Sequence, residues 1–520
     1  MPFGKLLSFL YRGERSLSPR TGARLEGATP ALSMHDYRLD HRQAGHKRCD
    51  NYGLGSGSVQ SDPSSARVWC ILSLLSMGSF HIWTIGCQMN VADSRRLAES
   101  LEGYGLTAAE TPAAADVVVL YSCVVRQTAE DRVHSQLHDL KQLKAQRPGL
   151  KVVVAGCVSD IPDWRKRYPF VDLIAEPGQD LTVRDRLIDL LDLSERYRFD
   201  PDQAVRLPGI SEGVTIHQGC NRSCTYCIVP STRGGERSRP PGVIVDEVRR
   251  LCERGTREVV LLSQIVERYG RDLRPRVLLS DLLHMLNDQV PGLERIRFLT
   301  SYPGDFGRDL IDAIADLPRV CEDVNLPIQS GDDEVLRRMK RGYVVDHYRQ
   351  LIDKLRSRIA HVGLSTDIIV GFPGETEAEF DNTLRMLDEF RFDVVHVAMY
   401  SPRPGTVAAT TMRDDVPREE KRRRLHEVES LQKRVATTIN AGYLGRTVDV
   451  LVEGVAKGRW YGRTRTNKLV HFASEQALGG ALVDVEITAT EPWYLEGQLL
   501  ANRTAISRRF VAPPLGASGR

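Results

Sequence analysis

The chain has 520 residues, 41% of them hydrophobic and 27% charged, a composition typical of a globular protein with two to four domains. With 71 Lys and Arg against 68 Asp and Glu, the net charge of +3 says little about binding partners, so any nucleic-acid surface would have to be a local patch. Ten cysteines are too few for a disulfide scaffold, and the best apolar run, 69–77, is too short to span a membrane. A cytoplasmic protein is therefore expected.

The segment 1–78 is rich in Arg, Ser and Gly and shows little periodicity, so we expect a mostly disordered extension. Its basic, Ser-containing composition would also suit a targeting peptide. A gene start placed too early is the simpler interpretation, because Met77 stands just before the first convincing strand. We favour this second interpretation.

Strand and helix patterns alternate regularly from residue 80. Strands are expected at 80–85, 117–121 and 151–155, with helices over 91–103 and 128–145. Such alternation predicts right-handed βαβ units, and hence an open parallel α/β sheet domain over 79–195.

A polar, proline-containing linker is expected around 194–212, and the alternation resumes beyond it. Six further strands are expected at 214–216, 258–262, 296–299, 324–326, 363–370 and 393–397. Six β/α units predict a central partial (β/α)6 barrel over 208–440. A charged helix from Pro417 to about Asn440 is predicted to be too polar for the core, and its basic run 421–424 to be a solvated face.

The last regular segment, 442–505, changes character, because apolar and polar residues alternate at 448–452 and 482–487 between Gly-rich turns. This pattern predicts a small antiparallel β-barrel. The tail, 506–520, is expected to be frayed.

Cys220, Cys224 and Cys227 form a C-x₃-C-x₂-C run, with Tyr226 directly before the last cysteine. Three thiolates within eight residues can hold three irons of a 4Fe–4S cluster. Electron-transfer clusters close all four positions with cysteine, so the spacing leaves the fourth iron open to a small molecule.

Cys87, Cys123 and Cys157 each follow directly on a predicted strand. The carboxyl ends of parallel strands share one edge, where ligands bind in open α/β sheets, so three thiols could converge there. Each could instead be a small buried residue at a strand end. Their recurrence in three successive βα units favours a second cluster. The other cysteines, expected to be structural or incidental, are Cys49, Cys70, Cys252 and Cys321.

Several motifs together resemble the radical S-adenosylmethionine (SAM) methylthiotransferase family. They are Thr-Ile-Gly-Cys-Gln-Met-Asn at 84–90, Ser-Cys-Val-Val-Arg at 122–126, Ala-Gly-Cys at 155–157, and the segments 228–239, 326–331 and 366–376. The resemblance covers about 80–505 and identifies the terminal barrel as similar to a TRAM domain, an RNA-binding module. The Cys-Gln-Met-Asn form and the segment 462–468 favour the MiaB branch.

The resemblance implies an enzyme that adds a methylthio group to carbon 2 of N6-isopentenyladenosine beside the tRNA anticodon. It implies two 4Fe–4S clusters: one on Cys220, Cys224 and Cys227 that cleaves SAM to a 5′-deoxyadenosyl radical, and one on the other cysteine set that supplies or relays sulfur. A second SAM would provide the methyl group. A flavodoxin- or ferredoxin-type electron donor, a tRNA substrate, no membrane and a monomer are expected, with no catalytic side chain beyond the cluster ligands.

Four residues are candidates for binding SAM: Tyr226 near the adenine, Gln329 and Ser330 near the ribose or methionine portion, and Gly371, where backbone can approach the nucleoside. Each could equally serve local packing.

A basic and aromatic stretch in the barrel is the candidate RNA surface, because cations follow phosphates and aromatic rings stack on unpaired bases. A solvated charged face is the alternative. The RNA-binding candidates are Lys457, Arg459, Trp460, Arg463, Arg465 and Lys468.

One segment departs from the family pattern. A loop of the Gly-Gln-Asn-Val-Asn type is expected where this chain has Ser-Gln-Ile-Val-Glu-Arg-Tyr-Gly at 263–270. Related branches act on threonylcarbamoyl-adenosine in tRNA or on an aspartate of a ribosomal protein, and both remain alternatives. A non-catalytic iron–sulfur protein that binds RNA is a third, although the missing fourth cysteines argue against it.

Overall fold

The computed structural model describes residues 78–122, 127–157, 161–175, 180–193 and 208–503. The chain divides into two units, 1–74 and 75–520, and every described residue belongs to the second. Several predicted features lie outside the described residues: the extension up to residue 77, the linker over 194–207, the tail 506–520, and Cys123 with residues 124–126.

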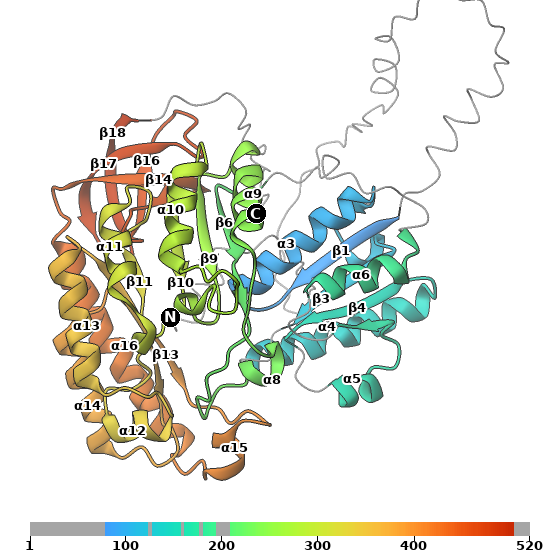
Figure 1. The fold of residues 1–520 in the computed structure, drawn as a ribbon, viewed down its shortest axis with the longest axis horizontal. Helices are drawn as coiled ribbons and strands as arrows, with labels where there is room; N and C mark the ends of the chain where they lie inside the picture. The colour runs from blue at the N-terminus through green and yellow to red at the C-terminus, as the bar shows by residue number, and fades with distance from the viewer. Residues whose placement is uncertain (1–77, 123–126, 158–160, 176–179, 194–207, 504–520) are drawn as a thin grey trace, which may run out of the picture. The chain divides into compact units, whose positions relative to one another are not determined.

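The first part of the second unit is built on a five-stranded parallel sheet in the order β2-β1-β3-β4-β5. Its strands are β1 (Ser79–Thr84), β2 (Thr107–Ala108), β3 (Val117–Ser122), β4 (Lys151–Gly156) and β5 (Leu173–Ile174). Its helices are α3 (Gln88–Gly103), η2 (Pro112–Ala114), α4 (Gln127–Gln146), α5 (Ile161–Arg167) and α6 (Asp180–Leu190). β3 and the valines of β4 are buried, as expected of strands covered on both faces. The predicted parallel α/β sheet is confirmed (Figure 1).

The central part contains six parallel strands in two three-stranded sheets, β10-β9-β6 and β11-β12-β13. The strands are β6 (Ser211–Thr215), β9 (Glu258–Leu262), β10 (Arg295–Leu299), β11 (Asp323–Asn325), β12 (Gly363–Val370) and β13 (Val394–Met399). A parallel bridge between Ile296 and Val320 joins the two sheets, and one hydrophobic core runs through both. The predicted partial barrel is therefore confirmed.

Helices follow the barrel strands along the chain: α9 (Pro241–Glu253), α10 (Leu279–Gln289), α11 (Arg308–Asp316), α12 (Asp333–Arg338), α13 (Val345–Arg358) and α14 (Glu377–Phe390). Shorter elements connect them: β7 (His217–Gln218), α8 (Val229–Arg233), β8 (Arg237–Ser238), η4 (Val266–Arg268), η5 (Pro303–Asp305) and α15 (Val407–Thr411). Because all six strands are parallel, their carboxyl ends open on the same end of the barrel.

Helix α16 (Arg418–Ala441) corrects the prediction that this segment is too polar for the core. Val428, Leu431 and Val435 are buried in the same core as the barrel strands. Arg424, in the run predicted to be a solvated face, is only 4% exposed and donates to Glu375 Oε2 at 2.9 Å. Glu420, four residues earlier in the helix, also pairs with Arg424 at 2.7 Å, but Glu375, which meets it in the core, comes from a distant segment.

The last part is a closed barrel with the strand order β14-β15-β16-β18-β17. Its strands are β14 (Thr447–Ala456), β15 (Arg459–Arg463), β16 (Leu469–Ala473), β17 (Leu482–Thr490) and β18 (Leu495–Asn502). The predicted small barrel is confirmed, and its strand pairs are antiparallel except for β16 and β18, which are parallel. Directions cannot alternate all the way around a closed ring with an odd number of strands, and one parallel pair is required.

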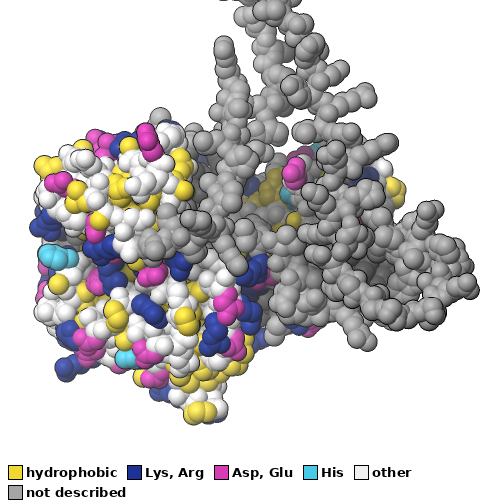
Figure 2. Space-filling view, turned by 90° about the horizontal axis from the view of Figure 1, so that it is seen from above, with side chains coloured by type: hydrophobic (Ala, Val, Ile, Leu, Met, Phe, Trp, Pro, Cys, Tyr) yellow, Lys and Arg dark blue, Asp and Glu magenta, His cyan; other side chains and the backbone are white. Residues whose placement is uncertain are grey.

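Where Figure 2 shows the described residues in colour, acidic and basic side chains are interspersed on the surface. Within the described part of the chain, no helix is both long and apolar enough to cross a membrane.

Candidate functional site

The C-x₃-C-x₂-C loop lies between β7 and α8, beyond the carboxyl end of β6. It folds back on itself: Cys220 N–H donates to the Gly234 carbonyl at 3.1 Å, and Cys227 N–H to the Cys224 carbonyl at 3.1 Å. Gly219 enters the loop with φ +79°, and a Cβ there would lie 2.1 Å from the Gly235 carbonyl oxygen. Only glycine fits this turn.

The thiols of this loop are close enough to affect each other electrostatically. Burial, with smaller contributions from the neighbouring Cys224 and Cys220, raises the pKa of Cys227 to about 12. Among the described residues, no three His, Cys, Asp or Glu side chains form a site for one metal ion. Cysteines that hold a four-iron cluster bind different irons and so lie further apart than the ligands of a single ion. Three neighbouring thiols on one folded loop suit a cluster rather than a single ion.

Arg341 contacts this loop from the segment after α12, and sequence reasoning missed it. Its side chain is 5% exposed, and Nη1 donates to Cys224 Sγ at 3.5 Å and to Tyr226 Oη at 3.2 Å. Nη2 donates to the Pro327 carbonyl at 2.8 Å. A guanidinium is therefore held against one of the predicted ligands. No spacing signal links it to the cysteines, which lie more than a hundred residues earlier.

Tyr226 joins the cysteine loop to the carboxyl ends of β12 and β13. It packs against a small hydrophobic cluster that contains Phe372 and Tyr400. Gly371, directly before Phe372, has φ +70°, and its N–H donates to Glu375 Oε2 at 2.5 Å. The structure thus brings Tyr226 close to the strand-end segment that contains Gly371.

Gln329 and Ser330 lie beside β12. The Gln329 N–H donates to the Asp367 carbonyl at 2.9 Å, in a parallel bridge to Ile368, and its side chain is half-buried. Ser330 Oγ is buried and lies 3.4 Å from Thr383 Oγ1. These contacts suit local packing, and SAM binding by either residue stays a prediction.

Unpartnered polar atoms gather at the same end of the barrel strands. Within the described residues, His217 Nε2, Gln264 Oε1 and Tyr400 Oη are buried and have no hydrogen-bond partner. They stand beyond the carboxyl ends of β6, β9 and β13 respectively. Buried polar groups without partners are rare in folded proteins, so this end of the barrel suits a polar ligand such as SAM.

The second set of cysteines lies at the carboxyl edge of the five-stranded sheet. Cys87 is the exposed residue before α3, and Cys157 is buried just after β4, with its N–H donating to the Ser122 carbonyl at 3.1 Å. Asn90 Nδ2 donates to the carbonyls of Ile85 at 3.1 Å and of Ser122 at 2.7 Å. The ends of β1, β3 and β4 are thereby held together, although Cys123 itself lies outside the described residues.

The two cysteine-bearing segments lie against each other. Arg233, at the end of α8, donates through Nε to Cys157 Sγ at 3.2 Å. Gln264 Nε2 lies 2.8 Å from Met89 Sδ, so the divergent loop after β9 contacts the first cysteine motif. Arg95 of α3 pairs with Glu247 of α9 at 2.9 Å. Sequence reasoning missed Arg233, because its contacts come from a different domain.

Two of the predicted RNA-binding residues connect the terminal barrel to the central part. Lys468 is buried, with Nζ 2.6 Å from Asp393 Oδ1. Arg465 Nε donates to Glu322 Oε2 at 2.7 Å.

The other RNA-binding candidates lie within the barrel or on its surface. Arg459 pairs with Glu496 at 3.0 Å, Arg463 lies 3.4 Å from Glu453, and Trp460 Nε1 donates to the Ser474 carbonyl at 3.1 Å. Lys457 is exposed in the turn before β15. RNA binding by these four residues stays a prediction.

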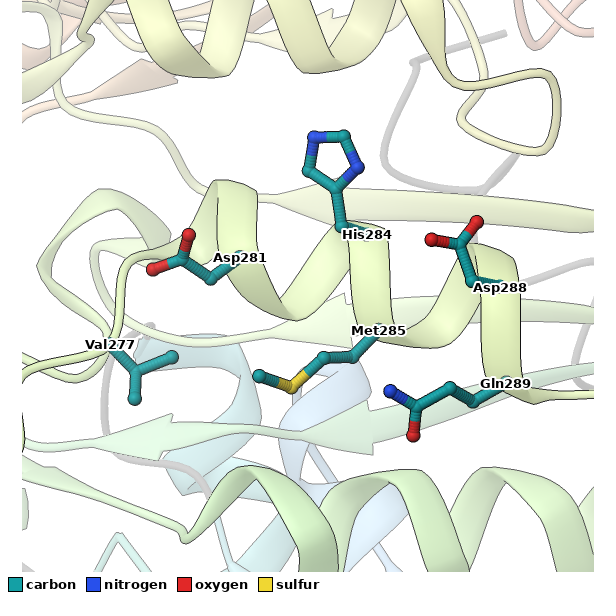
Figure 3. Close-up of a pocket in the computed structure, with 6 residues that line it drawn as sticks. All are labelled: Val277, Asp281, His284, Met285, Asp288 and Gln289. Atoms are coloured by element: carbon teal, nitrogen blue, oxygen red, sulfur yellow. The ribbon is translucent and has the colours of Figure 1, made fainter.

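A surface hollow elsewhere contains none of the predicted residues. Figure 3 shows its lining: Val277, and Asp281, His284, Met285, Asp288 and Gln289 of α10.

Three family descriptions match the chain: "Radical SAM superfamily" over 214–387, "Uncharacterized protein family UPF0004" over 79–175, and "TRAM domain" over 442–500. A tRNA-2-methylthio-N(6)-dimethylallyladenosine synthase from Herpetosiphon aurantiacus is 45% identical over 437 residues, covering 82% of this chain and 98% of that protein. One from Dehalococcoides mccartyi is 45% identical over 426 residues, covering 82% and 99%.

The chain belongs to this family. It is a radical SAM methylthiotransferase, a transferase whose cofactors are SAM and 4Fe–4S clusters. Among solved structures, the radical SAM methyltransferase TsrM from Kitasatospora setae, with cobalamin and a 4Fe–4S cluster bound, aligns with a TM-score of 0.48 at 14% identity. That alignment covers 64% of this methylthiotransferase and 74% of that chain.

Proposed function

We propose that this methylthiotransferase adds a methylthio group to carbon 2 of N6-isopentenyladenosine beside the anticodon of tRNA. Its curated relatives are named for this product. The observation that carries the proposal is the contact between the two cysteine-bearing segments, made by Arg233 on Cys157 and by Gln264 on Met89. A site that activates SAM and a site that holds sulfur must be neighbours if both act on one carbon atom.

The cofactors supply the difficult chemistry, because a C–H bond of the adenine ring is neither acidic nor electrophilic enough for acid–base substitution. When bound, SAM and the clusters provide one-electron chemistry and sulfur. We assign one cluster to Cys220, Cys224 and Cys227, and the other to Cys87, Cys123 and Cys157.

The chain's own residues bind and orient these groups. Arg341 donates hydrogen bonds to Cys224 Sγ and Tyr226 Oη, and these bonds orient the cysteine loop. Tyr226, Gln329, Ser330 and Gly371 are the proposed SAM contacts. The support is strongest for Tyr226, because it packs with Tyr400, whose buried hydroxyl has no partner among the described residues.

The barrel is the proposed tRNA-binding surface. We expect exposed Lys457 and the partly exposed Arg459, Trp460 and Arg463 to make the phosphate and base contacts. Lys468 and Arg465 already pair with carboxylates of the central part, so they are expected to position the barrel as well. A monomeric state, a flavodoxin- or ferredoxin-type donor and a cytoplasmic location stay predictions.

The test is mass spectrometry of tRNA nucleosides from a strain that lacks the gene, complemented with wild type or variants. Wild type should restore the methylthio-isopentenyl nucleoside, and Cys224→Ala should leave unmodified isopentenyladenosine in its place. Cys252→Ala is the matched control, because Cys252 is a buried cysteine outside both predicted sets and should restore the product. Unchanged tRNA in the deletion strain would contradict the proposal.

The segment 263–270 differs from the family pattern and contacts the first cysteine motif through Gln264. The same samples should therefore also be examined for other methylthiolated products. Loss of a methylthio-threonylcarbamoyl nucleoside, or of methylthio-aspartate in a ribosomal protein, would assign the enzyme to a related branch. A protein that binds iron but never cleaves SAM under reduction would be the non-catalytic alternative.

A further inference from the structure

Arg233, the last residue of α8, contacts the five-stranded-sheet domain through its guanidinium group. Its side chain is 6% exposed. Nε donates to Cys157 Sγ at 3.2 Å, Nη2 to Asn90 Oδ1 at 2.8 Å, and Nη1 to Asp93 Oδ2 at 3.5 Å. The three nitrogens of one guanidinium thus contact three residues of the second cysteine site and its motif.

The position of Arg233 along the chain connects the two sites. Helix α8 begins at Val229, two residues after Cys227, and ends at Arg233. One short helix therefore joins the SAM-cleaving loop to a side chain that contacts Cys157. Asn90, the second acceptor, also holds the ends of β1 and β3 through Ile85 and Ser122. Displacement of either site would be transmitted to the other through these contacts.

The contact stabilises the thiolate form of Cys157 more than its thiol form. Arginine stays protonated in proteins, and a charged donor makes a shorter and stronger hydrogen bond to an anionic acceptor than to a neutral one. Hydrogen bonds to the sulfurs and the local charge set the reduction potential of an iron–sulfur cluster. A buried guanidinium on a ligand sulfur stabilises the more negative, reduced state and so raises the potential.

We propose that Arg233 is a positioning residue for the second cluster: its hydrogen bond to Cys157 orients that thiolate toward the SAM-cleaving loop and raises the reduction potential of the cluster held there. This inference rests on the proposed assignment of Cys157 as a cluster ligand.

The experiment isolates the second cluster in the full-length chain. Cys220, Cys224 and Cys227 are replaced by alanine, the protein is reconstituted with iron and sulfide under anaerobic conditions, and the cluster is titrated by electron paramagnetic resonance. In this parent, Arg233→Met is expected to shift the midpoint potential to a more negative value and to change the spectrum. Arg233→Lys keeps the charge but loses the planar fork, and should give an intermediate potential.

Arg95→Met is the matched control. Arg95 is buried to the same degree and joins the same two domains, through Glu247 at 2.9 Å and Glu212 at 3.3 Å, so it binds carboxylates where Arg233 binds a cysteine. Its removal should loosen the domain contact and leave the potential at the parent value.

The outcomes separate this inference from the proposed function. Equal potentials in the parent, Arg233→Met and Arg233→Lys would overturn the role of Arg233. If Arg233→Met holds no iron, the Arg233→Lys variant tests the proposal instead. A midpoint potential of Arg233→Lys equal to that of the parent would contradict the proposal. If instead Cys157→Ala keeps the full iron content and spectrum of the parent, the ligand assignment itself fails.

Discussion

Burial changes the pKa of one carboxyl group, that of Glu267, by a large amount. It lies in the divergent loop after β9, where the family resemblance leads us to expect asparagine, and it is 8% exposed. Its Oε2 accepts the Tyr302 N–H at 3.1 Å. Burial, with a smaller contribution from the nearby Asp305, raises its pKa from 4.5 to about 7. A carboxyl group with this pKa retains its proton over part of the physiological range.

The stability of the protein should therefore fall as pH rises through this window. Between about pH 4.5 and 7 the unfolded carboxyl ionises while the folded one stays protonated, so the folded state binds more protons. Above pH 7 both are ionised and the penalty stays constant, on the order of 3 kcal/mol for a shift of this size.

Glu267→Gln removes this titration. Thermal unfolding of the reconstituted protein should show the variant more stable than wild type at pH 8, with an advantage that shrinks steadily toward pH 5. A difference between variant and wild type that does not depend on pH would contradict the assignment.

At the scale of the element, the cysteine loop depends on one turn and on the two short elements around it. β7 pairs with β8, and Gly219 lets the chain pass within reach of the Gly235 carbonyl before Cys220. The loop is then closed by α8, whose last residue contacts the other domain. Ligand geometry is thus set by backbone contacts as well as by cysteine spacing.

Gly219→Ala should disrupt this loop, because a Cβ would meet backbone at 2.1 Å in a left-handed conformation. Iron per protein should drop by about half if only the second of two equal clusters is retained, and SAM cleavage should be lost. Gly242→Ala in α9 is the control, because a Cβ there has nothing within 4 Å, and its iron content should match wild type. Normal iron content and SAM cleavage in Gly219→Ala would show that the turn is not required.

For the whole molecule, two arginines of β10 attach the terminal barrel to the central part. Arg297 donates to the carbonyls of Thr464 at 2.7 Å and Arg465 at 2.8 Å, and Arg295 to that of Arg463 at 2.5 Å. Arg297 also pairs with the buried carboxylates of Glu258 at 2.8 Å and Asp323 at 3.2 Å. The barrel is therefore held by buried charges of the core, in addition to the chain connection at α16.

Arg297→Met should leave Glu258 and Asp323 buried and unpaired, at a cost of about 3–5 kcal/mol in unfolding free energy. Limited proteolysis should cut near residue 442 faster than in wild type, and binding to tRNA should weaken. Arg349→Met is the comparison, because its pair with Glu389 is exposed and should contribute under about 1 kcal/mol. Equal proteolysis rates in both variants would exclude this role for Arg297.

Some features could be predicted from sequence because they depend on neighbouring residues. The strand at 258–262 is identical in β9, since four consecutive apolar residues form its run, and that at 363–370 is identical in β12, where buried and half-buried residues alternate. The burial of Arg424 in α16 could not be predicted, because Glu375 lies far away in the sequence. The basic stretch around Lys468 predicts that this residue binds RNA. In the structure it pairs with Asp393 of another domain, which the local sequence does not indicate.

The sequence by itself determined the C-x₃-C-x₂-C spacing, the cysteines at three strand ends and the order of the three domains, because these depend on residues close along the chain. Only the tertiary structure decided which charges are buried and which segments meet. Arg341 contacts Cys224, and Arg233 contacts Cys157, across separations of 117 and 76 residues. Such contacts arise from packing between elements, which leaves no local pattern in the chain.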